Sequence, residues 1–270
     1  MEKWVREDRL PHIWCSGCGI GTMLSAYLRS LNNVGADPKK VAFVSGIGCV
    51  GRAPGYITVD AFHTTHGRGI PFAVGLKLAR PELHVHVLSG DGDLFSIGGN
   101  HFIHAARRNI NLLVICSNNF IYGMTGGQLA PTTPHEAEST TSPYGNIEHP
   151  FNTPHLADAA GATYVARWTA LHARRLEESI TEALQMKGFR YIEVLTPCPT
   201  TFGRRNEYRE GLDMLKYFKD NAKIVNGADT SQVDIELGKE IIVGNFVRRE
   251  KPTYLEGLEK LYKRVRGESG

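Results

Sequence analysis

The stretch Ser89–Gln128, SGDGDLFSIGGNHFIHAARRNINLLVICSNNFIYGMTGGQ, decides the fold that we expect for this chain. Its Gly90-Asp91-Gly92 triplet and its Asn118-Asn119 pair each follow directly on an apolar run. Between them, residues 98–109 have the pattern of a helix. The order strand, helix, strand predicts two neighbouring parallel strands. The carboxyl ends of such strands are where open α/β sheets bind ligands.

The two polar clusters carry groups that suit a magnesium ion and a phosphate. Asp91 supplies a carboxylate and Asn119 an amide oxygen, and Mg²⁺ prefers such hard oxygen ligands together with substrate phosphates and water. The glycines on either side of Asp91 let backbone N–H groups approach a phosphate closely. The triplet alone fits an ordinary turn equally well. The asparagine pair, 25 residues after the triplet, makes the pattern far more specific.

Length and composition limit the possible classes of protein. The chain of 270 residues is long enough for one large α/β domain or two small ones. Its 41% hydrophobic and 22% charged residues are ordinary for a soluble globular protein. No apolar run reaches the roughly 18 residues of a membrane span, and the start has no apolar signal core. A net charge of +3 without a basic face argues against nucleic-acid binding. We expect a cytoplasmic enzyme or enzyme subunit.

Four of the five cysteines lie just beyond the ends of expected elements. Cys15 and Cys18 precede a helical pattern at 20–31, Cys49 lies in a glycine-rich turn, and Cys198 follows an apolar strand at 189–195. Cys116 lies inside an apolar strand and is expected to be a small core residue. A disulfide framework is not expected in a cytosolic chain of this size. Four thiolates serve zinc and iron–sulfur clusters equally, and the spacing alone does not decide between them.

Two further segments are candidates for ligand contacts. The segment 63–68, HTTHGR, is expected to be a loop that grips a diphosphate or a pyrimidine, with a plain solvated loop as the alternative. A metal site there is disfavoured because no third ligand is near. The segment 122–128, YGMTGGQ, has small residues that allow a backbone to approach a ligand, although a generic flexible loop has the same composition.

The remainder of the chain predicts one more α/β unit and a tail. Helices are expected near 157–161 and over 170–187, each followed by a strand, at 163–167 and 189–195. The polar, turn-rich segment 135–151 is expected to lie on the surface. Residues 203–270 contain basic runs and few apolar stretches. We interpret them as a C-terminal extension of a domain at 1–202, which covers the cysteine site or wraps a partner.

The combined pattern resembles the β subunit of 2-oxoacid:ferredoxin oxidoreductases over about residues 10–200. The triplet and asparagine pair are similar to the fingerprint of thiamine diphosphate (ThDP) enzymes. The likeness extends to WCSGCG, SGIGCVGR, HTTHGR and the late TPCP, and IGGNHFIHAARRN and YGMTGGQ(x)₂PTTP most resemble the 2-oxoglutarate branch. The resemblance implies a thiamine-diphosphate-binding fold, a mostly parallel sheet with helices on both faces. The family pattern usually has proline where this chain has Ser16.

The resemblance also implies roles for particular residues. The Mg²⁺ of ThDP would be held by Asp91, Asn119 and the carbonyl of Ile121. A [4Fe–4S] cluster would be held by Cys15, Cys18, Cys49 and Cys198. The contacts to ThDP map onto Ile47, Gly48, Cys49, Val50, His66, Gly92, Asp93, Gly123 and Met124.

The activity implied is the coenzyme A-dependent oxidative decarboxylation of 2-oxoglutarate, with electrons leaving singly through the cluster to ferredoxin. Arg52 is a candidate to pair with a substrate carboxylate, or only to neutralise nearby phosphate or cluster charge. Arg52 and His66 are therefore the candidate catalytic residues. This chain has one ThDP-type domain. The family places the pyrimidine-side domain and its catalytic glutamate on an α subunit. We expect a heterodimer or a dimer of heterodimers, with room for further small subunits.

Three alternatives stay open on sequence grounds. The same chemistry on pyruvate or branched-chain 2-oxo acids would need only a different substrate pocket. A non-redox ThDP decarboxylase or lyase subunit would use the four cysteines for structural zinc. A scaffolding subunit would carry the cluster without a working ThDP site.

Overall fold

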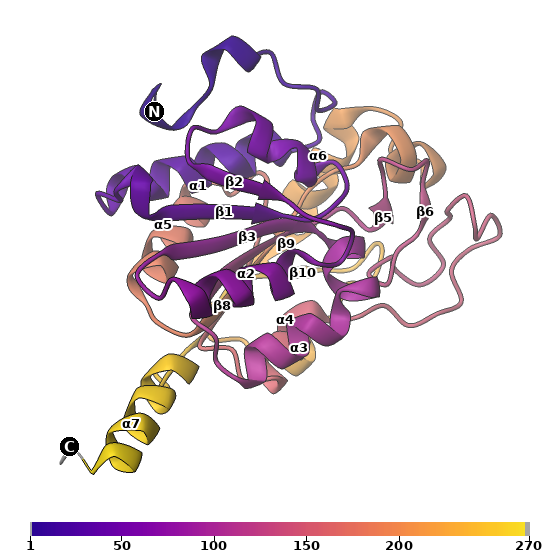
Figure 1. The fold of residues 1–270 in the computed structure, drawn as a ribbon. Coiled ribbons are helices and arrows are strands. Elements are labelled where there is room, and N and C mark those ends of the chain that lie inside the picture. Colours follow the sequence, from indigo (N-terminus) through magenta and orange to yellow (C-terminus); the bar gives the residue numbers. More distant parts are fainter. Residues whose placement is uncertain (1, 268–270) are drawn as a thin grey trace.

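A twisted eight-stranded sheet forms the centre of the molecule in the computed structural model, which describes residues 2–267 (Figure 1). The strand order is β2-β1-β3-β4-β8-β7-β10-β9, and every neighbouring pair is parallel except β7 with β10. The strands are β1 (Val41–Ser45), β2 (Asp60–His63), β3 (His84–Gly90), β4 (Leu112–Asn118), β7 (Tyr164–Thr169), β8 (Phe189–Leu195), β9 (Ala222–Ile224) and β10 (Ile241–Arg248).

Helices cover both faces of this sheet, and each face has its own hydrophobic core. On one face α1 (Ile20–Asn33), α5 (Ala173–Gln185) and α6 (Gly211–Asn221) contribute residues to the core, among them Met23, Leu176 and Phe218. On the other face α2 (Gly69–Ala79), α3 (Gly99–Arg107) and α4 (Thr153–Ala159) contribute Ile70, Phe102 and Ala157. The central strand β4 is buried at every position, which is why its sequence is a continuous apolar run. The expected α/β fold class is confirmed.

The strand, helix, strand unit expected from the sequence is present. β3 ends at Gly90 and β4 at Asn118, and the two pair in parallel with Gly90 opposite Ser117. A π-helical turn, Asp93–Ile97, leads from β3 into α3. Both polar clusters therefore lie at the same edge of the sheet, as the sequence predicted. A small hairpin, β5 (Ile121–Tyr122) and β6 (Gln128–Leu129), follows β4 at this edge.

The C-terminal part of the chain contributes to the sheet as well as to the surface. The strand-like residues 241–243 belong to β10, which pairs antiparallel with β7. The first residue of α6, Gly211, lies against the loop that carries Cys15 and Cys18. A Cβ placed on Gly17 of that loop would lie 3.1 Å from the Cα of Gly211. The last helix, α7 (Tyr254–Arg266), projects from the body and has no buried residue (Figure 1). The division at residue 202 stays a prediction.

Two observations refine the expectations from sequence. The polar segment 135–151 is not confined to the surface, because Ala137, Ser139 and Asn146 are buried and Asn146 donates hydrogen bonds to carbonyls of its own loop. Within residues 2–267, no helix is long and apolar enough to cross a membrane.

Candidate functional site

A pocket opens at the carboxyl ends of β1, β3 and β4, where most of the expected ligand residues meet. Its lining comes from four segments of the chain, at or after the ends of β1, β2, β3 and β4. The predicted residues that line it are Ile47, Gly48, Cys49, Val50, His66, Asp91, Gly92, Asp93, Asn119, Ile121, Gly123 and Met124. Arg52 is exposed and does not line this pocket. The roles of all these residues stay predictions, but their expected proximity is observed.

Asp91 is a buried carboxylate at the floor of the pocket. Burial raises its pKa to about 7, against the lowering effect of a hydrogen bond from the Thr132 hydroxyl and of backbone N–H groups. Only 2% of the residue is exposed. A buried carboxylate is costly when charged unless a cation accompanies it. The site therefore fits a divalent cation.

Asn119 is held next to Asp91 by the turn that follows β4. Asn118, the last residue of the strand, accepts a hydrogen bond from the Phe120 N–H (3.1 Å), and Phe120 takes a positive φ of 64°. Thr133 donates to the Phe120 carbonyl (2.6 Å) from the segment PTTP. The turn is thus tied at both ends, which fixes where Asn119 and the carbonyl of Ile121 lie.

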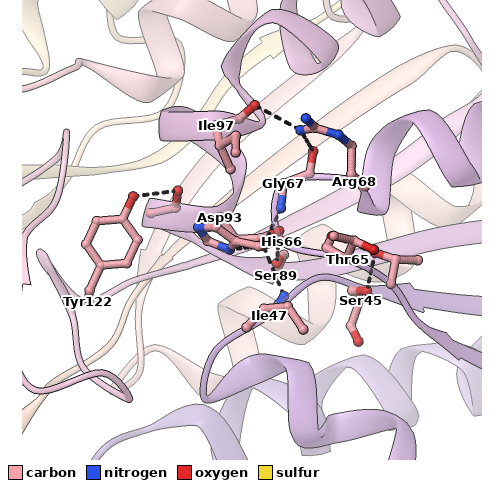
Figure 2. A network of polar contacts seen from close by, with 12 residues as sticks. Ser45, Ile47, Thr65, His66, Gly67, Arg68, Ser89, Asp93, Ile97 and Tyr122 are labelled. Carbon is pink, nitrogen blue, oxygen red and sulfur yellow. Dashed lines mark hydrogen bonds and ion pairs between the residues drawn. The ribbon is translucent and has the colours of Figure 1, made fainter.

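Asp93 connects several loops of the pocket through hydrogen bonds (Figure 2). One carboxylate oxygen, Oδ1, accepts from the N–H of Ile47 (3.0 Å), the N–H of Gly67 (2.8 Å) and Nδ1 of His66 (2.7 Å). The other, Oδ2, accepts from the Ser89 hydroxyl (2.8 Å). Ile47 follows β1, His66 and Gly67 follow β2, and Ser89 lies near the end of β3. One buried side chain therefore connects the ends of three strands.

The four expected cluster cysteines gather beside this pocket. Cys15 is exposed, whereas Cys18 and Cys198 are buried. Burial, and after it the nearby thiols of Cys198, Cys18 and Cys15, raise the pKa of the Cys49 thiol to about 11. Both Cys15 Sγ and Cys198 Sγ lie within 4.0 Å of the Thr200 hydroxyl. The fifth cysteine, Cys116, is fully buried in β4, as expected for a core residue.

The spacing of these thiols bears on the kind of metal they suit. Throughout residues 2–267, no three histidine, cysteine or acidic side chains converge closely enough for a single metal ion. A tetrahedral zinc with Zn–S bonds of about 2.3 Å would bring its four sulfurs within ~4 Å of one another. In a four-iron cluster each thiolate binds its own iron, so the sulfurs lie further apart. Which of the two the four thiols hold stays a prediction.

Four residues at the site had not been assigned a role from the sequence. Ser89 and Thr132 bond to the two aspartates from outside the pocket. Ser117 and Tyr122 line it, and the Tyr122 hydroxyl donates to the Gly92 carbonyl (3.2 Å). The stretch 89–128 contains Ser89, Ser117 and Tyr122, and PTTP contains Thr132. Only the fold brings Thr132 back to Asp91 across 41 residues.

Taken together, a parallel sheet with a polar, metal-suited pocket at its carboxyl edge defines a cofactor-binding α/β protein. Residues 46–194 match the family described as "Thiamine pyrophosphate enzyme, C-terminal TPP binding domain". That range contains the whole pocket and Cys49 but not the other cluster cysteines.

Full-length relatives identify the family more narrowly. The chain is 52% identical over 266 residues to "2-oxoglutarate synthase subunit KorB" of Methanocaldococcus jannaschii, covering 98% of both chains. It is 38% identical to the "2-oxoacid:ferredoxin oxidoreductase subunit beta" of a Sulfolobus species, covering 91% of this chain and 85% of that one. A solved structure, "2-oxoglutarate:ferredoxin oxidoreductase from Magnetococcus marinus with 2-oxoglutarate, coenzyme A and succinyl-CoA bound", is 34% identical, covers 100% of this chain and 91% of that one, and has a TM-score of 0.88. The chain belongs to the family of 2-oxoacid:ferredoxin oxidoreductase β subunits.

Proposed function

We propose that this chain binds ThDP with Mg²⁺ and a [4Fe–4S] cluster, as the β subunit of a coenzyme A-dependent 2-oxoglutarate:ferredoxin oxidoreductase. The observation that carries the proposal is the adjacency of two sites. Cys49 lines the same pocket as Asp91 and Asn119, and a Cβ placed on Gly123 of that pocket would lie 3.2 Å from Cys198 Sγ. An electron carrier is thus next to the place where a substrate would be oxidised.

The residues at the floor of the pocket fit the metal and diphosphate end of ThDP. Asp91, Asn119 and the Ile121 carbonyl would hold Mg²⁺, which offsets the buried negative charge of Asp91. A Cβ on Gly92 would collide with the Tyr122 ring, so this backbone approaches its neighbours too closely for a side chain. When bound, ThDP supplies an electron sink for the bond between the carboxylate and the keto carbon.

The rest of the pocket would orient the reactants and exclude water. Ile47, Val50 and Met124 present apolar surface toward the space above the metal site, and His66 presents an imidazole nitrogen. The four thiolates Cys15, Cys18, Cys49 and Cys198 would hold the cluster that takes the electrons one at a time. Cys15 is the exposed member, so electrons would leave toward ferredoxin on that side.

The identity of the substrate is tested in the complex with its α subunit. Anaerobic reduction of a viologen dye would be followed with coenzyme A and, in turn, 2-oxoglutarate, pyruvate and 2-oxoisovalerate. We expect 2-oxoglutarate to be preferred. Preference for another acid would change the assigned substrate and leave the rest of the proposal as it is. No reduction with any acid, by a complex that contains iron and ThDP, would favour the decarboxylase or scaffold alternatives and overturn the proposal.

The cluster is tested separately by iron content. Each of Cys15→Ala, Cys18→Ala, Cys49→Ala and Cys198→Ala should lose most of the roughly four irons per chain after anaerobic purification. Cys116→Ala is the matched control, because Cys116 is buried in β4 away from this group, and it should keep its iron. One zinc per chain in place of iron would identify the site as structural.

A further inference from the structure

The Asp93 carboxylate accepts most of its hydrogen bonds from the protein itself. Asp93 is 3% exposed. Its two carboxylate oxygens together accept four hydrogen bonds, from Ile47, His66, Gly67 and Ser89. Gly46 is packed so closely against this carboxylate that a Cβ there would collide with it. Asp93 lines the pocket, but its hydrogen-bonding capacity is directed into the protein. Its expected direct contact with ThDP stays a prediction.

These contacts determine which nitrogen of His66 carries the proton. Two backbone N–H groups already donate to Oδ1 of Asp93, so this oxygen is a pure acceptor. His66 Nδ1, 2.7 Å from the same oxygen, must then be the donor. The neutral imidazole is consequently held as the Nδ1–H tautomer, with a lone pair on Nε2.

His66 lines the pocket, and the side of its ring opposite Asp93 points toward Tyr122 (Figure 2). The side chain is 35% exposed, and the Tyr122 ring flanks it with centroids 6.0 Å apart. In the part of the chain that the structure describes, nothing hydrogen-bonds to Nε2. This nitrogen is available to a bound molecule.

Other titratable groups of the pocket have different partners. Asp91 accepts from Thr132 and fits a metal ligand, and Cys49 fits a cluster ligand. The Tyr122 hydroxyl donates to the Gly92 carbonyl, and burial raises its pKa. His66 Nε2 is therefore the side-chain proton acceptor that this chain can offer to a reactant.

We propose that His66 Nε2 accepts the proton of the coenzyme A thiol when the thioester forms, and that Asp93 is a positioning residue that holds His66 in the required tautomer. This inference rests on the proposed function. The S–H bond breaks and an N–H bond forms at Nε2. The sulfur electron pair would form the S–C bond to the acyl carbon, while the bond that joined this carbon to ThDP would break and leave its electron pair on ThDP. The acyl carbon would by then have lost CO₂ and delivered two electrons, one at a time, through the cluster to ferredoxin. The Asp93 carboxylate offsets the charge of the imidazolium.

The tautomer is tested on the full chain without any cofactor. Nitrogen-15 NMR of histidine-labelled protein distinguishes the two neutral forms, and the His66 signals are identified by their loss in His66→Asn. We expect Nδ1–H in the wild type and a shift toward Nε2–H in Asp93→Ala. A wild-type spectrum with His66 as Nε2–H overturns the inference, whether or not the Asp93 variant folds.

The proton transfer is tested in the assembled enzyme. His66→Asn keeps an N–H donor near the Nδ1 position but removes Nε2. We expect kcat to fall about 10²–10⁴-fold with the KM for 2-oxoglutarate within threefold. A single round of CO₂ release without coenzyme A should stay within threefold of the wild type. The control His104→Asn, on the exposed face of α3, should leave all three unchanged.

The outcomes separate the two proposals. If CO₂ release without coenzyme A falls as far as kcat does, His66 acts before the thiol reacts and the proposed role is wrong. If the wild-type complex oxidises no 2-oxo acid, the proposed function fails, while the NMR result still decides whether Asp93 positions His66.

Discussion

At the scale of single residues, Gly46 shows how closely the site is packed. The Asp93 carboxylate occupies the space that a side chain at position 46 would need. We predict that Gly46→Ala destabilises the chain by about 1–3 kcal/mol, because the Asp93 contacts to three loops must shift. Urea denaturation measures this. Gly55→Ala is the control, since no atom lies within 4 Å of a Cβ there. Equal effects of the two changes would contradict the packing argument.

Arg52 offers a second test at this scale. Its side chain is exposed, and within residues 2–267 it forms no ion pair. If it binds the distal carboxylate, Arg52→Leu loses a charged hydrogen bond of about 1.5–3 kcal/mol. The KM for 2-oxoglutarate should then rise roughly 10–100-fold, and the KM for pyruvate should change far less. A similar rise for both acids would remove the recognition role.

The sequence could predict the residues of the site better than their functions. Spacing and neighbouring apolar runs placed Asp91 and Asn119 at one sheet edge, which the structure confirms. It could not reveal that Asp93 bonds inward, because that depends on two backbone N–H groups from distant loops. Thr132 was equally hidden, since a threonine in a loop has no pattern that indicates its partner.

At the scale of elements, local periodicity predicted most strands and helices. β8 was expected over 189–195 and lies there, because a strand buried on both faces is a continuous apolar run. The strands near the two edges of the sheet were harder to predict from the sequence. β2 is a short strand of exposed and half-buried residues. At the other edge β10 pairs antiparallel with β7, and β9 runs parallel to β10. Such non-local pairings leave little signature in a single sequence.

A buried polar network couples these elements to the site. Glu193 on β8 is bonded to Arg167 on β7, and it also accepts from Asn118 Nδ2 (2.8 Å) and the Thr153 hydroxyl (2.6 Å). Asn118 in turn supports the turn that carries Asn119. The side chains of Arg167 and Glu193 are each 1% exposed, so each charge is stabilised by the other and not by water.

We predict that Arg167→Met destabilises the chain by about 3–5 kcal/mol, because it leaves the Glu193 charge buried without its cation. The measurement is the free energy of unfolding in urea. Arg175→Met is the matched control: Arg175 forms an exposed ion pair with Glu178 and should change stability by less than about 0.5 kcal/mol. A small effect at Arg167 would mean that the network contributes little.

At the scale of the whole molecule, the pocket is only partly covered by this chain. Ile47 and Met124, which line it, are 40% and 47% exposed. Phe62 and Phe72, on either side of the HTTHGR segment in sequence, are also exposed, and their ring centroids lie 4.9 Å apart. Large apolar side chains at the rim of a site favour a surface that a partner covers. This agrees with membership of a family of β subunits.

We therefore predict that the isolated chain has no turnover. Two carboxylates line its pocket. Asp91 fits a metal ligand, and Asp93 accepts four hydrogen bonds from other residues of the chain. We assign neither of them to the activation of the pyrimidine ring of ThDP, and we expect that group to come from the α subunit. Purified chain with iron, ThDP and Mg²⁺ should reduce no viologen with 2-oxoglutarate and coenzyme A, and adding the α subunit should restore the reaction. In the complex, Asp91→Ala should abolish it again. Turnover by the chain alone would show that it contains a complete active site, and activity of the Asp91→Ala complex would show that the pocket described here is not the site of reaction.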